Sequence, residues 1–87
     1  MRKHDVKKNG VQIPFTEPEF MDKWQEWLQY RKERRLPGYV ATGLKHTFTK
    51  LVNDSQNDYR IAIQIIDQSL SQGWQGLFPI KAINNGA

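Results

Sequence analysis

Residues 15–20, FTEPEF, predict where the first helix of this chain begins. Thr16 can act as the N-cap, and Glu19, three residues later, can reach back to complete a capping box. The proline between them suits a first turn, where its missing amide hydrogen would have no partner. Phe15 and Phe20 can pack on each other as a hydrophobic staple. This combination of signals predicts that an ordered domain starts at Phe15.

Apolar residues then recur at helical spacing in three segments. The period predicts helices over residues 17–35, 40–53 and 58–72, separated by stretches rich in Pro, Gly, Asn and Asp. The side chains expected in the core are Phe20, Trp24, Leu28, Leu44, Phe48, Leu51, Ile63, Ile66 and Leu70. Three amphipathic helices with short connections predict an all-α protein, a small three-helix bundle.

The rest of the chain divides around this bundle. We expect residues 1–14 to form a flexible basic arm or linker, residues 15–81 the helical domain, and residues 82–87 a flexible tail. An 87-residue chain with 38% hydrophobic residues is enough for one compact domain. No apolar run reaches the length of a membrane span, and cysteine is absent, so we expect a cytoplasmic protein with no membrane partner.

Residues 73–81, GWQGLFPIK, concentrate apolar side chains where no helix can continue. They can complete the core, dock a partner, or offer rings on which bases stack. We predict that the segment leaves the third helix at Gly73 and folds back to bury Trp74 and Phe78, with Leu77 or Ile80 nearer the rim. The groove expected to receive them is lined by Trp24, Leu28 and Ile66. Any part left exposed would be an interaction site, so the candidate protein-interaction residues are Trp74, Leu77, Phe78 and Ile80.

Enzyme signatures are missing from the sequence. It has no glycine-rich phosphate loop, no cysteine nucleophile and no motif of paired carboxylates or histidines. His4 and His46 are its only histidines, so a metal site is not expected. We therefore predict a protein that binds rather than catalyses, with no cofactor, no metal and no small-molecule substrate.

A net charge of +4 favours a partner with negative charge. On the first predicted helix, the apolar stripe grades into an edge of cations and aromatic rings, which is the composition of surfaces that bind single-stranded DNA. The candidate nucleic-acid-binding residues are Lys23, Tyr30, Arg31, Arg34 and Arg35 on this edge and Lys7 and Lys8 in the arm. The alternative is that the arginine stems merely cover Trp24 and Trp27 and carry their charges to water.

Two stretches resemble a known family. AIQIIDQSLSQGWQGLFPIK (62–81) is similar to the closing motif of phage and prophage replication proteins of the replisome-organiser type, and WQEWLQYRKERRLPGY (24–39) resembles the Trp-rich helix that precedes it there. A more distant resemblance is to the C-terminal domain of DnaD-type primosomal proteins, whose Tyr-xxx-Ile-xxx-Trp motif is implicated in single-stranded DNA binding. Tyr59 and Ile63 match that motif, but its third position is Asp67, so the motif does not carry DNA binding over to this chain.

The resemblance implies a non-catalytic accessory module of DNA replication. Its expected partner is a replicative helicase or helicase loader, with single-stranded DNA as a further candidate. Two alternatives stay open: a DNA-only module that uses the arm and the edge of the first helix, and a structural interaction domain of a phage protein.

Overall fold

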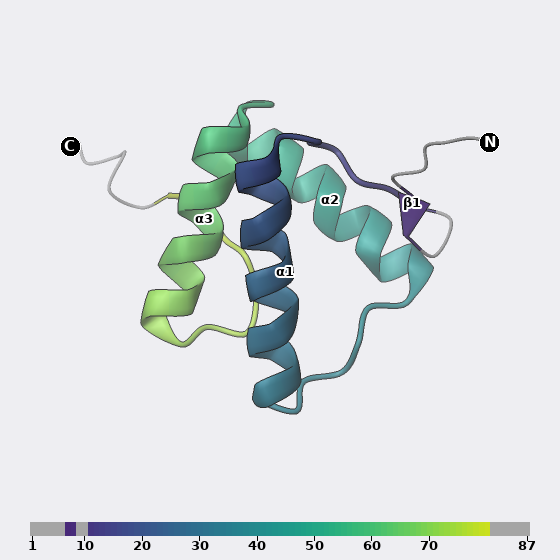
Figure 1. The fold of residues 1–87 in the computed structure, drawn as a ribbon, viewed down its shortest axis with the longest axis vertical. Helices are drawn as coiled ribbons and strands as arrows, with labels where there is room; N and C mark the ends of the chain where they lie inside the picture. Colours follow the sequence, from purple (N-terminus) through teal and green to yellow (C-terminus); the bar gives the residue numbers. More distant parts are fainter. Residues whose placement is uncertain (1–6, 9–10, 81–87) are drawn as a thin grey trace.

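A computed structural model describes residues 7–8 and 11–80, and in it three helices pack around one core (Figure 1). Helix α1 spans Pro18–Glu33, α2 spans Ala41–Ser55 and α3 spans Tyr59–Gln72. Each lies within two residues of the predicted bounds at either end. The predicted all-α class is confirmed.

The start of α1 differs from the predicted capping box. Its N-cap is Glu17, not Thr16, and no side chain caps it with a hydrogen bond. The reason lies in Pro18, because the residue before a proline is pushed out of the helical region, and Glu17 accordingly adopts an extended conformation with ψ 135°. The contact between Phe15 and Phe20 is present, with ring centroids 5.1 Å apart in an edge-on arrangement.

Left-handed residues end the three helices. α1 stops before Arg35 (φ 59°) and α2 stops before Gln56 (φ 58°). Gly73 (φ 74°) is the C-cap of α3, as predicted, and reverses the chain there. Asp58 begins α3, since its carboxylate accepts a hydrogen bond from the amide of Arg60 at 2.9 Å, and this contact holds the pKa of Asp58 below its ordinary value.

The core is rich in aromatic rings. Phe20, Trp24 and Trp27 are almost completely buried, and the Trp24 ring lies 5.0 Å from the Phe48 ring of α2. Six of the nine predicted core residues are buried. The exceptions, which are only partly buried, are Leu28, Ile63 and Leu70. On α3 the fully buried positions are instead Ala62, Ile65, Ile66 and Ser69, so this helix turns a face centred one residue away toward its neighbours.

The folded region begins before Phe15. Ile13 is 6% exposed and belongs to the core, and Val11 packs against it. Strand β2 (Val11–Gln12) also pairs antiparallel with β1 (Lys7–Lys8). The prediction that residues 11–14 belong to a flexible arm is therefore wrong. Val11, Ile13 and Phe15 occupy alternate positions, and three positions are too few for a periodic pattern to predict that they pack on the helices. The rest of the predicted arm, residues 1–6 and 9–10, and the predicted tail, 82–87, lie outside the described residues.

None of the helices in the described part of the chain is both long enough and apolar enough to cross a bilayer.

Candidate functional site

The segment after α3 turns back across the bundle (Figure 1). We call residues 73–80 the return segment. It forms no helix or strand, and the amides of Gly73 and Trp74 both donate to the Ser69 carbonyl, the latter at 3.0 Å. Leu77 and Ile80 pack against the core. The predicted return of the chain at Gly73 is confirmed.

Two side chains of α1 and that of its C-cap residue, Arg34, donate hydrogen bonds to the first three carbonyl oxygens of the return segment. These are Arg34 Nη1 to Gly73 at 3.0 Å, Tyr30 Oη to Trp74 at 2.7 Å, and Arg31 Nη1 to Gln75 at 2.9 Å. Arg34 Nη1 also donates to Tyr30 Oη at 2.9 Å, which joins two of these donors into one network. The C-terminal half of α1 thus holds the return segment by its backbone.

The other two helices supply donors for the next four carbonyls. These are Ser69 Oγ to Gly76 at 2.7 Å, Lys50 Nζ to Leu77 at 3.1 Å, and Gln68 Nε2 to Phe78 at 3.4 Å and to Pro79 at 3.2 Å. Every carbonyl from residue 73 to residue 79 therefore accepts a hydrogen bond from a side chain. Because irregular backbone must satisfy its polar groups one by one, this series fixes a segment that has no ladder of its own.

The amides of the return segment are used differently. Within the described residues, the backbone N–H groups of residues 75–78 and 80 make no hydrogen bond. The segment therefore satisfies its acceptors inside the molecule, while these donors have no partner among the described residues.

The side chains of the return segment do not follow the predicted burial. Phe78 is 45% exposed, while Trp74, Leu77 and Ile80 are partly buried. The prediction that Phe78 is buried, with Leu77 or Ile80 nearer the rim, is wrong. Leu77 takes the inward position, and the Phe78 ring folds back over Gly76, where an added Cβ would meet it at 3.3 Å. The same ring meets Trp74 edge-on, with centroids 5.4 Å apart.

The predicted basic edge of α1 is mostly engaged inside the molecule. Besides its bond to Gln75, Arg31 donates to the Pro37 carbonyl at 2.7 Å and lies 4.3 Å above the ring of Tyr39. The Arg31 guanidinium therefore also holds the α1–α2 connection. Arg31 and Arg34 thus use their guanidinium groups on backbone carbonyls of the domain, a role that neither the DNA-binding hypothesis nor its alternative predicted.

The remaining predicted DNA-binding residues are dispersed. Lys23 makes ion pairs with Asp67 at 2.7 Å and with Glu26 at 2.8 Å, and hydrogen bonds to these carboxylates, Asp67 first, raise the pKa of Lys23. Arg35 is exposed just after α1, and its side chain has no partner among the described residues. For Lys7 and Lys8 only the backbone is described, in β1.

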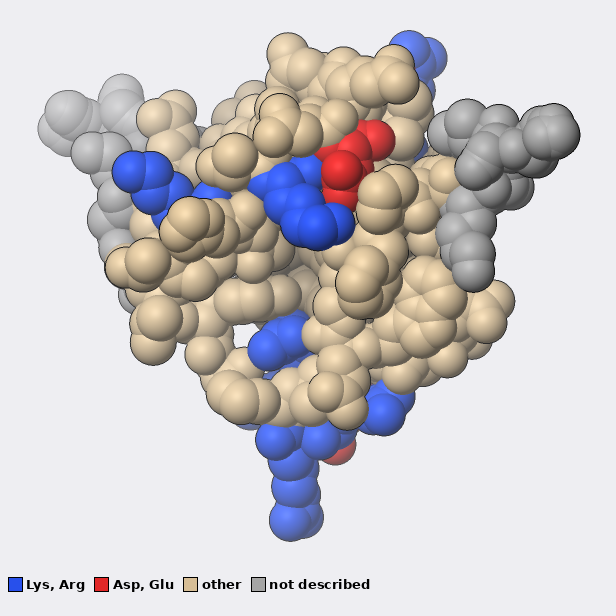
Figure 2. Space-filling model, turned by 180° about the vertical axis from the view of Figure 1, so that it is seen from behind, with Lys and Arg blue, Asp and Glu red and all other residues tan. Residues whose placement is uncertain are grey.

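Seen from behind, the surface is mostly uncharged (Figure 2). One basic side chain lies against an acidic one near its middle, and further basic side chains gather along its lower edge, where α1 ends in Figure 1. An ion pair joins Lys50 Nζ to Asp54 at 2.7 Å. The exposed cations at the end of α1 are Lys32, Arg34 and Arg35.

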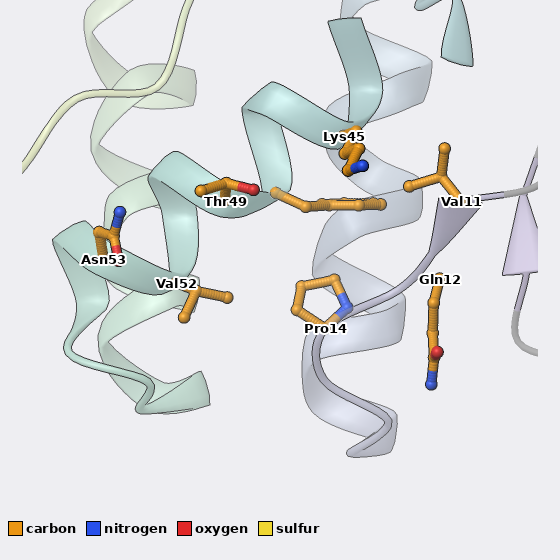
Figure 3. A pocket seen from close by; sticks show the side chains of 8 residues that line it. Val11, Gln12, Pro14, Lys45, Thr49, Val52 and Asn53 are labelled. Carbon is orange, nitrogen blue, oxygen red and sulfur yellow. The ribbon is translucent and has the colours of Figure 1, made fainter. Parts of the chain in front are cut away.

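A groove of about 440 Å³ lies elsewhere, between α2 and the segment that leads into α1 (Figure 3). Pro14 and Val11 line one side, and Val52 and Thr49 of α2 line the other. Its polar lining residues are amides, a hydroxyl and one lysine, Lys45. Among the described residues, no group of His, Cys, Asp or Glu could hold a metal ion. This groove offers no arrangement of acid, base and nucleophile.

Residues 17–87 match the family described as the YdaU C-terminal domain. The chain belongs to this family. The match covers all three helices and the return segment. The family is of phage and prophage type, as the sequence resemblance implied. Ile13 and Phe15 pack into the domain from outside the matched residues. No curated protein and no solved structure matches the chain.

The sequence did not predict which side chains of α2 and α3 donate hydrogen bonds to the return segment. Ser69 is completely buried. The sequence feature that could have indicated its role is a small polar residue on the apolar side of a predicted helix. Lys50 and Gln68 carry no such signal, because a long polar side chain on a helix is ordinarily solvated.

Proposed function

We propose that this YdaU-type domain is a non-catalytic accessory module of DNA replication that helps to recruit or load a replicative helicase in the cytoplasm of a bacterial host. Membership of a phage-type family supports this proposal, as does the resemblance of residues 24–39 and 62–81 to the replisome-organiser and DnaD-like proteins. In this proposal the partner is the helicase or its loader.

The observation that carries the proposal is the way in which the return segment is held. Its carbonyls are fastened to all three helices, and yet Phe78 remains 45% exposed. A backbone so constrained presents an aromatic side chain at little entropic cost on binding. Aromatic anchors on a preorganised backbone are typical of protein interfaces.

A direct binding experiment tests the proposal. The nuclease-treated protein is mixed with purified host helicase or loader, and complex formation is followed by size-exclusion chromatography at low and at high salt. We expect a complex that weakens with salt but remains detectable at high salt, because screening reduces the charged contacts and not the apolar contact with Phe78. The absence of a complex with either protein would contradict the proposal.

A second candidate, contact with single-stranded DNA, is favoured by the exposed cations Lys32 and Arg35, which have no carboxylate partner among the described residues. Binding through phosphates would weaken steeply as salt is added. Anisotropy of a labelled oligothymidylate at two salt concentrations distinguishes this candidate from protein docking.

A further inference from the structure

We propose that the return segment binds an acidic segment of a protein partner and that an apolar side chain of that segment packs on Phe78. This inference rests on the proposed function for the existence of a protein partner. It adds the surface that is used and the chemistry that this surface selects.

The first argument is the separation of donors from acceptors along the return segment. Its carbonyls, from Gly73 to Pro79, are occupied by side chains of the domain. Its amides at residues 75–78 and 80 have no partner among the described residues. A ligand that completes these hydrogen bonds must bring acceptors, and carboxylate and carbonyl oxygens are the acceptors that a peptide offers.

The second argument is charge. Arg31 and Arg34 border the first half of the segment, and neither has a carboxylate within ion-pair distance among the described residues. Lys50 borders the second half, and Asp54 neutralises it. The border is therefore net positive, and this sign favours a partner with acidic residues and raises the rate of encounter with it.

The third argument concerns the exposed ring. Phe78 lies beside Trp74, and these rings offer a partner an apolar patch next to the cations. Lys50 Nζ lies 5.5 Å from the centroid of the Phe78 ring, so part of the surface on which a base would stack is already covered by a cation. The geometry favours an acidic peptide with an apolar anchor over a nucleic acid.

A peptide titration followed by amide NMR tests the inference on the full chain. The probe is a short synthetic peptide with leucine and phenylalanine at its centre and aspartates on both sides, and the control peptide has asparagine in place of aspartate. We expect the amide signals of residues 75–78 to shift with the acidic probe and to shift much less with the control. Equal shifts with both peptides, or shifts confined to the groove between α2 and Pro14, would overturn the proposal.

Matched variants locate the anchor. Phe78→Ala should weaken binding of the acidic peptide about tenfold, the size expected for an aromatic anchor. Val40→Ala alters another exposed apolar side chain, 70% exposed at the start of α2, and should leave the affinity unchanged. An unchanged affinity of Phe78→Ala would overturn the proposal, as would an oligothymidylate that shifts the amides of residues 75–78 when the acidic peptide does not.

The two proposals fail in different ways. If purified helicase and loader do not bind but the acidic peptide shifts the amides of the return segment, the proposed function is wrong and the surface stands. If helicase or loader binds, but Phe78→Ala does not weaken the complex and the peptide does not compete, the proposed function stands and the surface is wrong.

Discussion

Two irregular segments flank the helices, and they are held to the bundle by different forces. Residues 13–17 lead into α1 and are fixed by apolar side chains, since Ile13 and Phe15 are each 6% exposed. The return segment, residues 73–80, packs Leu77 and Ile80 on the core but is also fixed by its carbonyls, and it leaves Phe78 45% exposed. The apolar side chains that hold residues 13–17 are buried in the core. The return segment, held by its backbone, leaves the Phe78 ring exposed.

The largest effect that this comparison predicts is on the entry side. Phe15→Ala should lower the free energy of unfolding by about 3–5 kcal/mol, because a buried phenyl that contacts Phe20 is lost and a cavity remains. Urea unfolding followed by circular dichroism measures this change. Phe15→Leu should restore most of the stability. A loss below about 1 kcal/mol would mean that residues 13–17 are not part of the core.

An intermediate effect is expected at Ser69, which fastens the return segment from within α3. Ser69→Ala removes the donor to the Gly76 carbonyl and should cost about 1–2 kcal/mol in the free energy of unfolding. Ser55→Ala is the matched control, since Ser55 is equally buried but donates to the Val52 carbonyl, which also accepts a hydrogen bond from the Asn57 amide. Equal losses in the two variants would show that the fastening contributes nothing beyond burial of a serine.

The helices were predictable from the sequence because the 3.6-residue period and the turn residues act locally. The staple of Phe15 on Phe20 and the reversal at Gly73 were also readable, since each depends on neighbours in the chain. The cap of α1 was misjudged because Pro18 acts on the residue before it more strongly than Thr16 can act as a cap.

The candidate site was predictable only in part. The sequence singled out residues 73–81 and the cations of α1, but not that Arg31 and Arg34 donate to the backbone of the return segment. Those contacts join residues about forty positions apart in the chain, so they depend on how α1 and α3 pack. The prediction placed Phe78 in the core and Leu77 or Ile80 nearer the rim, whereas the structure has the reverse. Neighbouring side chains in an irregular segment point in different directions, and the packing of the helices decides which one enters the core.

The smallest stability effect is expected at Phe78, and it sharpens the comparison most. Phe78→Ala should change the free energy of unfolding by less than about 1 kcal/mol, because the ring is about half exposed. The backbone carbonyl that accepts a hydrogen bond from Gln68 Nε2 is still present in the alanine variant. Leu77→Ala, one residue away and packed on the core, should cost more, about 2 kcal/mol. Urea unfolding of both variants, side by side, measures the difference. If Phe78→Ala lowers the free energy of unfolding as much as Leu77→Ala does, the Phe78 ring contributes to the core. If Phe78→Ala leaves the free energy of unfolding nearly unchanged, the exposed ring needs an explanation other than folding.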